Sequence, residues 1–238
     1  MDNNLFQLAD PYEIARVIKA MPKKTPVKAY VQGNLSNVQF TKGKQFGGGG
    51  FYVLFGDWKD VSAFLDFYKD RIALAELEWD RRNSAIPLLD IKKENARIEP
   101  GAVVREGVFL GEGCIIMMGA VVNMGAKIGA GSMVDMNAVI GARAIIGERV
   151  HVGAGAVLAG VLEPPSANPV RISDRVVIGA NAVILEGVAV GRHSVVAAGS
   201  VVTKDVPPDV VVAGTPASVI KRRDKRTDEK TRFLDDLR

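Results

Sequence analysis

The chain has 238 residues and a net charge of +4, and 47% of its residues are hydrophobic while only 6% are aromatic. This length accommodates one or two domains with a substantial core. The mild positive charge gives no support for nucleic-acid binding but suits a small polyanionic ligand. A single cysteine excludes an internal disulfide and fits a reducing cytoplasm. The polar N-terminus lacks a signal-peptide pattern and no apolar run reaches membrane-spanning length, so we expect a soluble cytoplasmic protein.

A small α/β domain is expected at residues 1–90, where no sequence repeat is found. Asp10 and Pro11 are typical of a helix N-terminus, and Pro22 ends the apolar pattern that follows them. The sequence therefore predicts a first helix between these prolines.

The rest of this domain is predicted from short apolar runs and turn residues. Residues 27–31 and 51–55 have β-strand character, and the glycines at 47–50 indicate a turn between extended segments. Asp57 favours the start of a second helix, and residues 72–82 are expected to continue as helix. The four glycines lack the Lys-Ser/Thr that follows a phosphate-binding loop, so we prefer a turn there.

A six-residue repeat begins at Ile98 and dominates the second half of the chain. A helix has a period of 3.6 and a strand a period of 2, so the repeat itself must be the structural unit. Hexapeptide repeats are typical of parallel β-helices, in which three hexads form one triangular coil of about 18 residues. The aliphatic residue and the small residue four positions later are expected to point inward. The aliphatic positions are Ile98, Val104, Leu110, Ile116, Val122, Ile128, Val134, Ile140, Ile146, Val152, Leu158, Ile172, Ile178, Ile184, Val190, Val196 and Val202.

The repeat is interrupted once, because 14 residues separate Leu158 from Ile172 where six are expected. Eight residues around 163–171 should therefore leave the wall as a loop, and its prolines stiffen it. Insertions in regular solenoids tend to carry binding function. We expect the prism to span residues 96–207 and a charged tail ending in a short helix to follow at 208–238.

Asp135 and His151 are the first candidates for catalysis. Asp135 stands at the hexad position that glycine usually occupies, and Val152 lies one coil beyond Val134. The two side chains should therefore lie about 5 Å apart along the prism axis. A carboxylate and an imidazole on one wall are suited to accept a proton from an amine. The alternatives are a solvated aspartate and a surface histidine.

A glutamate, the cysteine and the two histidines are further candidates for a catalytic or metal-binding role. Glu186 is expected on a different face about two coils from Asp135, so it can contribute only across a subunit interface; the alternative is a rim charge. Cys114 takes an inward position reserved for small residues, which favours packing over a covalent acyl-enzyme. The only histidines, His151 and His193, do not supply a three-histidine zinc site, so we expect no metal.

Five stretches of the chain carry a family resemblance. They are RRNSAIPLLD (81–90), RIEPGAVVR (97–105), IMMGAVVNMGAKIGAGSMVDMNAVIG (116–141), VHVGAGAVLAGVLEPPSANPV (150–170) and IGANAVILEGVAVG (178–191). These stretches closely resemble the tetrahydrodipicolinate N-acetyltransferases, a family of hexapeptide-repeat acyltransferases of the lysine and diaminopimelate pathway. The resemblance covers nearly the whole chain, and the combination of GSMVDMNAVIG with GVLEPPSANPV is its most specific part.

The resemblance implies a left-handed β-helix that transfers acetyl from acetyl-CoA to the amine of ring-opened tetrahydrodipicolinate. In the succinyl-transferring relatives, an arginine before the first coil and an aspartate act at the positions of Arg97 and Asp135. Their second catalytic carboxylate falls on Val183, so Glu186 is a candidate substitute. The partners expected are small molecules and further copies of the chain. We expect a homotrimer with active sites between subunits, because Asp135 and Glu186 lie apart and the flat outward faces carry apolar side chains such as Met117 and Leu185.

Both substrates are anionic, so positively charged side chains are candidates for binding them. Arg97 and Arg105 are expected to bind the dicarboxylate. Backbone N–H groups near residues 153–160 are candidates for stabilising the oxyanion of the transfer. The candidate acetyl-CoA-binding residues are Gly160, Ala180, Lys204, Gly214 and Lys221.

Two other classes of function stay open at this point. One is a different hexapeptide acyltransferase, which acts on a sugar or an amino acid or uses a succinyl donor. The other is a non-catalytic β-helix, but such proteins would show outward ranks of Thr or Ser repeating in every coil. This chain has none. The length of the acyl chain follows only from the resemblance.

Overall fold

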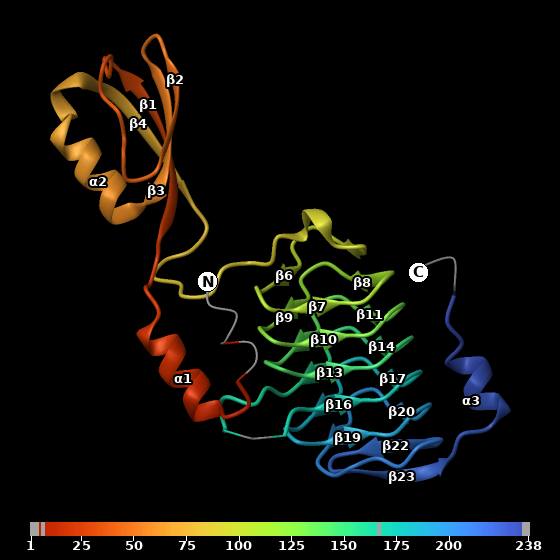
Figure 1. Cartoon of the computed structure of the whole chain (residues 1–238). Helices are drawn as coiled ribbons and strands as arrows, with labels where there is room; N and C mark the ends of the chain where they lie inside the picture. Colours follow the sequence, from red (N-terminus) through yellow and green to blue (C-terminus); the bar gives the residue numbers. More distant parts are fainter. Residues whose placement is uncertain (1–4, 6–7, 166–167, 235–238) are drawn as a thin grey trace. The chain divides into compact units, whose positions relative to one another are not determined.

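The computed structural model describes residue 5, residues 8–165 and residues 168–234 (Figure 1). The chain forms two compact units, one of residues 20–86 and one that combines residues 1–19 with residues 87–238. The domain boundaries expected from the sequence, at residues 90, 96 and 207, stay predictions.

The unit of residues 20–86 is a four-stranded antiparallel sheet with one helix. The strand order is β2-β3-β1-β4, and the apolar side chains of β1 and β3 alternate between buried and accessible positions. Helix α2 (Trp58–Phe67) begins after Asp57, whose side chain accepts a hydrogen bond from the N–H of Lys59 at 3.2 Å. The strands are β1 (Pro26–Gly33), β2 (Lys44–Gly48), β3 (Phe51–Asp57) and β4 (Ile72–Trp79), and a 3-10 turn, η2 (Lys69–Arg71), precedes β4.

The expected helix at residues 72–82 is wrong, because residues 72–79 form strand β4. The run Ile-Ala-Leu-Ala-Glu-Leu-Glu consists of good helix formers, but pairing with β1 along its length overrides that preference. The expected extended segments at 27–31 and 51–55 are confirmed. The turn expected at residues 47–50 is narrower in the structure: Gly49 and Gly50 form the turn of the β2–β3 hairpin, whereas Gly47 and Gly48 are paired with β3 as the last residues of β2.

Helix α1 (Pro11–Ala20) confirms the first predicted helix. A carboxylate oxygen of Asp10 accepts a hydrogen bond from the N–H of Tyr12 at 2.9 Å, and the carbonyl of Asp10 accepts from Ile14. This is the capping that an aspartate followed by proline predicts.

The second unit is dominated by a parallel β-helix with three flat faces (Figure 1). Before and after the interruption of the repeat, paired hexad strands are 18 residues apart, as in Ile128 with Ile146, so one coil consists of three hexads. Across the interruption the spacing is 26 residues, as in Val152 with Ile178. Face 1 contains β5 (Ala96–Ile98), β8 (Cys114–Ile116), β11 (Met133–Val134), β14 (His151–Val152), β17 (Val177–Ile178), β20 (Val195–Val196), β22 (Val210–Gly214) and β23 (Ala217–Arg222). Face 2 contains β6 (Val103–Val104), β9 (Val121–Val122), β12 (Val139–Ile140), β15 (Val157–Leu158), β18 (Val183–Ile184) and β21 (Val201–Val202). Face 3 contains β7 (Phe109–Leu110), β10 (Lys127–Ile128), β13 (Ile145–Ile146), β16 (Arg171–Ile172) and β19 (Ala189–Val190).

The prism interior follows the hexad pattern. The repeating aliphatic residues are buried except Ile98 at the end of the first strand, and the small residues between them are buried except Ala102 in the first coil. At the corners the coils approach so closely that side chains are excluded. A Cβ atom added at Gly141 would lie 2.2 Å from the backbone nitrogen of Gly160 in the next coil. The hexad interpretation is therefore confirmed.

The interruption of the repeat is confirmed as a loop. After β15 the chain leaves the wall, and β16 resumes the register by pairing Ile172 with Ile146. At the other end, β22 continues face 1 in parallel with β20, and β23 returns antiparallel to β22. A 3-10 turn, η3 (Ile91–Lys93), precedes the first coil, and α3 (Lys225–Lys230) is the expected short helix of the tail. No helix among the described residues is long and apolar enough to span a membrane.

Candidate active site

Asp135 and His151 lie side by side on face 1. Asp135 follows β11, and β11 pairs with β14 so that Met133 is opposite His151. The Oδ1 atom of Asp135 accepts a hydrogen bond from the N–H of Met136 at 2.8 Å. Its Oδ2 atom lies 3.9 Å from Nε2 of His151, which is within ion-pair range and too long for a hydrogen bond. The predicted proximity of the two side chains is confirmed.

Both side chains are partly accessible, with 22% of the Asp135 side chain and 27% of the His151 side chain exposed. The ring of Phe233, which follows α3, lies 6.2 Å from the His151 ring between centroids. The pair is therefore semi-enclosed, and it can exchange protons with a ligand that reaches face 1.

Arg97 is on the same face as this pair. It lies in β5, and the register Arg97–Ile115–Met133 places it two strands from β11. Its Nε atom is 3.4 Å from a carboxylate oxygen of Glu99, and about half of its side chain is exposed. Arg97 thus supplies positive charge to the outer surface that carries Asp135, at a distance of two coils.

Four other predicted residues lie at a different corner, between faces 2 and 3. Arg105, Gly160, Glu186 and Lys204 follow β6, β15, β18 and β21, whereas Asp135 is at the corner between faces 1 and 2. The structure does not bring these residues to Asp135 within one chain. For Glu186 this separation was expected, and its position two coils beyond Asp135 is confirmed.

Arg105 is held in place by its neighbours. Its Nη1 atom donates a hydrogen bond to Oδ1 of Asn123 at 3.1 Å, and burial lowers the pKa of its guanidinium group. Arg105 is therefore a half-buried, oriented cation at the corner between faces 2 and 3.

The side chains at the corner between faces 1 and 2 become smaller beyond Asp135. Met118 and Met136 are exposed there, whereas the equivalent residues of the next coils are Ala154, Ala180 and Ala198. Backbone hydrogen bonds connect these coils, with Asn181 N–H donating to Ala154 O and Gly199 N–H to Ala180 O, both at 2.9 Å. Ala154, Ala180 and Ala198 thus form a row of small residues that starts beside Asp135 and runs along the prism axis, the alanine track.

Gly214 and Lys221 belong to the last strands of face 1. The Gly214 N–H donates to Oγ of Ser200 at 3.2 Å, and the Lys221 ammonium group pairs with Asp224 at 2.9 Å. Gly214 ends β22 on the side of Ala180, so these two predicted acetyl-CoA residues share a corner. Gly160 and Lys204 share the other one.

Cys114 is fully buried, and its thiol lies 3.1 Å from the carbonyl oxygen of Gly129. Burial raises the pKa of this thiol, so it carries little thiolate at neutral pH. The packing interpretation is confirmed. No cluster of three or more potential metal ligands occurs among the residues that the structure describes.

Sequence reasoning missed the alanine track and the contact of Phe233 with His151. The first had a signal, since Ala154, Ala180 and Ala198 each follow an inward aliphatic residue by two positions. The second had none, because the path of the chain after β23 cannot be read from the repeat.

Sequence profiles of three families match the chain. The profile described as the N-terminal domain of tetrahydrodipicolinate succinyltransferase matches residues 9–91. The hexapeptide repeat of succinyl-transferase matches residues 100–124 and 169–204, and the bacterial transferase hexapeptide matches residues 125–160.

The names of full-length relatives specify acetyl transfer instead of succinyl transfer. A 2,3,4,5-tetrahydropyridine-2,6-dicarboxylate N-acetyltransferase from Clostridium perfringens is 61% identical over 233 residues, covering 98% of this chain and 99% of the relative. The enzyme of the same name from Brevibacillus brevis is 56% identical over 234 residues, covering 98% of this chain and 99% of the relative.

Solved structures align with about half of the chain. The acetyltransferase domain of PglB from Neisseria gonorrhoeae, in complex with acetyl coenzyme A, is 29% identical, with a TM-score of 0.48 and coverage of 53% of this chain and 58% of that one. A perosamine N-acetyltransferase from Caulobacter crescentus, in complex with CoA and GDP-perosamine, is 31% identical, with a TM-score of 0.46 and coverage of 52% and 56%.

Proposed function

Because this chain belongs to the tetrahydrodipicolinate N-acetyltransferase family of hexapeptide-repeat acyltransferases, we propose that it acetylates the amine of ring-opened tetrahydrodipicolinate in lysine and diaminopimelate biosynthesis. The full-length similarity to relatives named as N-acetyltransferases carries this proposal. The profile descriptions name succinyl transfer, but those matches are piecewise, so the full-length relatives favour acetyl. The single buried cysteine agrees with a reducing cytoplasm as the site of action.

The proposed reaction needs a base on the prism wall. The amine nitrogen attacks the thioester carbonyl of acetyl-CoA, its proton passes to the base, the C–S bond breaks, and CoA leaves as the thiol after protonation. Asp135 is the base in this scheme, because its Oδ2 atom is turned toward His151 while its Oδ1 atom is engaged with the Met136 N–H. His151 stands beside this carboxylate, with its Nε2 atom 3.9 Å from Oδ2 of Asp135.

The alanine track supports an acetyl-CoA site that begins at Asp135. An extended pantetheine arm requires a narrow surface without large side chains, and Ala154, Ala180 and Ala198 supply one along the corner between faces 1 and 2. Lys204 and Lys221 lie toward the C-terminal end of the prism, where they suit the phosphates of CoA.

Face 2 supports assembly into a homotrimer. Its outward side chains are all valine, and two of them, Val103 and Val139, are 39% and 38% exposed. Such an apolar stripe on a flat face suits contact with further copies of the chain rather than water. The stripe consists of Val103, Val121, Val139, Val157, Val183 and Val201.

A threefold axis facing face 2 would join the two groups of predicted site residues. Each subunit would then present its corner between faces 1 and 2 to the corner between faces 2 and 3 of its neighbour. The first corner carries Asp135, and the second carries Arg105, Glu186 and the loop after β15. In this arrangement, cations of one subunit bind the dicarboxylate whose amine is deprotonated by the other.

The direct test is a comparison of acyl donors. Purified protein is supplied with tetrahydrodipicolinate and either acetyl-CoA or succinyl-CoA, and both free thiol and product mass are measured. We expect thiol release and an N-acetyl product with acetyl-CoA and at least tenfold slower turnover with succinyl-CoA. Equal or faster succinyl transfer would assign the chain to the alternative donor, and no product with either would refute the proposal.

A further inference from the structure

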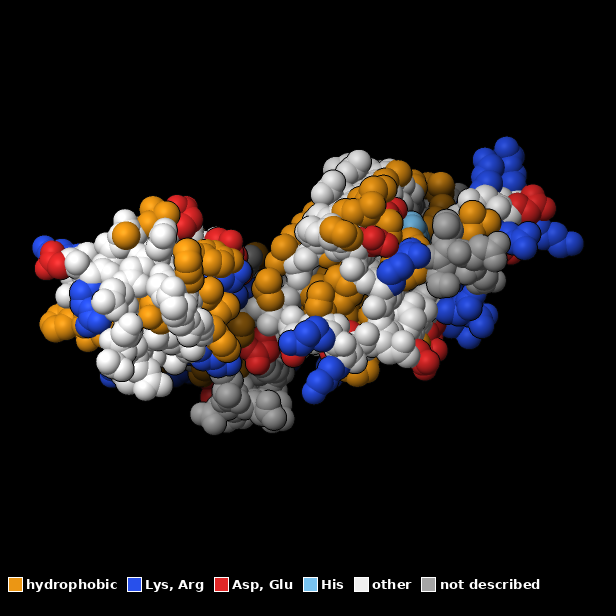
Figure 2. All heavy atoms as spheres, turned by 90° about the horizontal axis from the view of Figure 1, so that it is seen from above, with side chains coloured by type: hydrophobic (Ala, Val, Ile, Leu, Met, Phe, Trp, Pro, Cys, Tyr) orange, Lys and Arg blue, Asp and Glu red, His pale blue; other side chains and the backbone are white. Residues whose placement is uncertain are grey.

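The C-terminal segment carries the chain's excess of positive charge. Residues 221–232 contain seven basic and three acidic residues, a net charge of +4 that equals the net charge of the whole chain. Figure 2 shows Lys and Arg side chains gathered around this segment, at the right of the view. This excess of positive charge in one short segment creates a positive potential that attracts anions.

A cavity of about 430 Å³ lies between this segment and the corner that joins faces 3 and 1. Its charged lining comprises four arginines and one aspartate, so the walls are strongly positive. The prism contributes Arg149, Arg175 and His193, and the segment contributes Arg223, Asp228, Thr231, Arg232 and Phe233.

The prism wall of this cavity is built by successive corner turns. The N–H of Arg175 donates to Glu148 O at 2.9 Å and that of His193 to Asp174 O at 3.0 Å, so these residues stack coil upon coil. Arg149 and Arg175 both have positive φ, at 49° and 57°, where the first two coils of the same corner use glycine. A left-handed backbone is costly for arginine, which indicates that the side chains serve a purpose at this corner.

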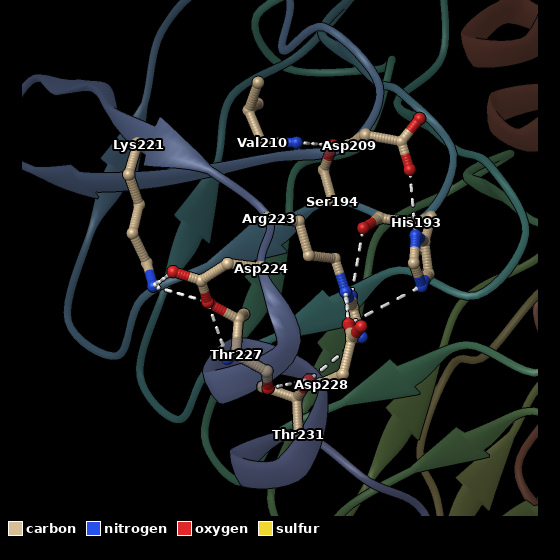
Figure 3. Close-up of polar contacts among 10 residues, drawn as sticks. All are labelled: His193, Ser194, Asp209, Val210, Lys221, Arg223, Asp224, Thr227, Asp228 and Thr231. Atoms are coloured by element: carbon tan, nitrogen blue, oxygen red, sulfur yellow. Dashed lines mark hydrogen bonds and ion pairs between the residues drawn. The ribbon is translucent and has the colours of Figure 1, made fainter.

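The segment wall is fixed by a network around Arg223 (Figure 3). The guanidinium group of Arg223 donates to Asp228 Oδ1 at 2.6 Å, to the carbonyl of His193 at 2.9 Å and to Thr231 at 3.0 Å. Hydrogen bonds from the Thr227 hydroxyl and then from Lys221 hold the pKa of Asp224 well below its usual range. The start of α3 is therefore anchored to the prism without using Arg175 or Arg232.

The charges of the network around Arg223 are internally matched, whereas two arginines of the cavity lining lack a counter-charge in the described parts of the chain. Asp228 pairs with Arg223, and Asp209 lies 2.8 Å from Nδ1 of His193. The side chains of Arg175 and Arg232 form no hydrogen bond or ion pair with any residue in the described parts of the chain. One belongs to the prism and the other to the segment, so positive charge lines the cavity on both of its walls.

We propose that this cavity binds a phosphate-type polyanion, which joins the C-terminal segment to the prism corner. Guanidinium groups on two walls of one cavity suit a tetrahedral oxyanion with several charged oxygens, because each can donate paired N–H groups. The site is distinct from the acetyl-CoA track, which follows the corner between faces 1 and 2 at the opposite ends of the face 1 strands.

Binding there has a consequence for the catalytic pair. Phe233 lines the cavity and also lies next to His151. A bound polyanion would therefore fix the position of the Phe233 ring on face 1.

The test uses the full chain and inorganic pyrophosphate as the probe. Isothermal titration at low ionic strength should show saturable binding to wild type, weakened about 10-fold or more in Arg175→Ala and in Arg232→Ala, the usual effect of losing one charge-assisted hydrogen-bonding group. Lys127→Ala is the matched control, because it removes one exposed positive charge on face 3. It should leave the affinity within about twofold of wild type.

Two further readouts separate this site from the active site. Pyrophosphate should slow hydrogen exchange in the peptide that covers residues 223–234, and saturating CoA should not displace it. The inference is overturned by absent binding at millimolar pyrophosphate, by equal loss in Lys127→Ala, by unchanged exchange of the peptide, or by competition with CoA. None of these readouts depends on which residue is the catalytic base or on which acyl donor is used.

Discussion

Replacing Asp135 by asparagine tests the assignment of the base. The amide keeps the shape of the side chain and an oxygen for the Met136 N–H at 2.8 Å, and it loses only the 3.9 Å ion pair with His151. A partly exposed pair of this kind contributes at most about 1 kcal/mol to stability. Removing a general base lowers turnover about 10²-fold to 10⁴-fold, equivalent to about 2.7–5.4 kcal/mol in the activation barrier. The kinetic effect should therefore far exceed any change in unfolding free energy.

The assay follows thiol release at saturating acetyl-CoA, with thermal unfolding recorded for each variant. Asp174→Asn is the matched control, because the Asp174 carboxylate also accepts a backbone N–H at 2.8 Å, from Glu148, at another corner. It should retain activity within about threefold, while His151→Asn should cost less than Asp135→Asn. Near-normal turnover of Asp135→Asn together with a severe loss in His151→Asn would reverse the assignment and make the histidine the base.

Three other changes probe the assembly, the loop and the cysteine. Val139→Lys places a charge in the valine stripe of face 2 and should convert the proposed trimer into monomers in light scattering at micromolar concentration. A trimer that is unchanged by this substitution would exclude face 2 from the interface. Deleting the eight residues between Val161 and Val170 should leave the unfolding transition intact but raise KM for acetyl-CoA or abolish activity, and normal kinetics in the folded variant would remove the loop from the site. Cys114→Ala should keep turnover within about twofold, and the native thiol should resist alkylation at pH 8, because burial raises its pKa above the ordinary value. In the unfolded chain this thiol ionises at a lower pH than in the folded chain. The stability that the neutral thiol contributes is therefore present below the ordinary cysteine pKa, and it falls as the pH rises above that value. Rapid alkylation with loss of activity would contradict the packing role of Cys114.

The hexad repeat predicts much of the prism because one rule determines burial, register and facing at every position. The 18-residue coil brings Asp135 to His151 and separates it from Glu186, and both consequences are visible in the sequence. The same rule fails for the cavity at the corner between faces 3 and 1. Arg149 and Arg175 are 26 residues apart, so they stack only because the loop adds eight residues to one coil.

The N-terminal unit was harder to predict because its local preferences conflict with its pairing. Strand β4 contains alanine, leucine and glutamate, which favour helix, and only its hydrogen bonds to β1 make it a strand. Strand β2 was missed because Lys-Gln-Phe-Gly-Gly has little β character and is ordered by β3. The contact of Phe233 with His151 depends on how β23 and α3 pack, which no local pattern encodes.

The most direct test of the account is whether one active site is shared by two subunits. Asp135→Asn and the loop deletion are co-expressed with different affinity tags, after each has been found inactive alone, and trimers carrying both tags are purified. If the site joins the Asp135 corner of one subunit to the loop of its neighbour, each trimer that contains both variants restores one of its three sites, about one third of the wild-type number. Thiol release well above either parent would agree with a shared site. Activity in the mixed trimers no greater than that of the parents would contradict it and place the whole site within one chain.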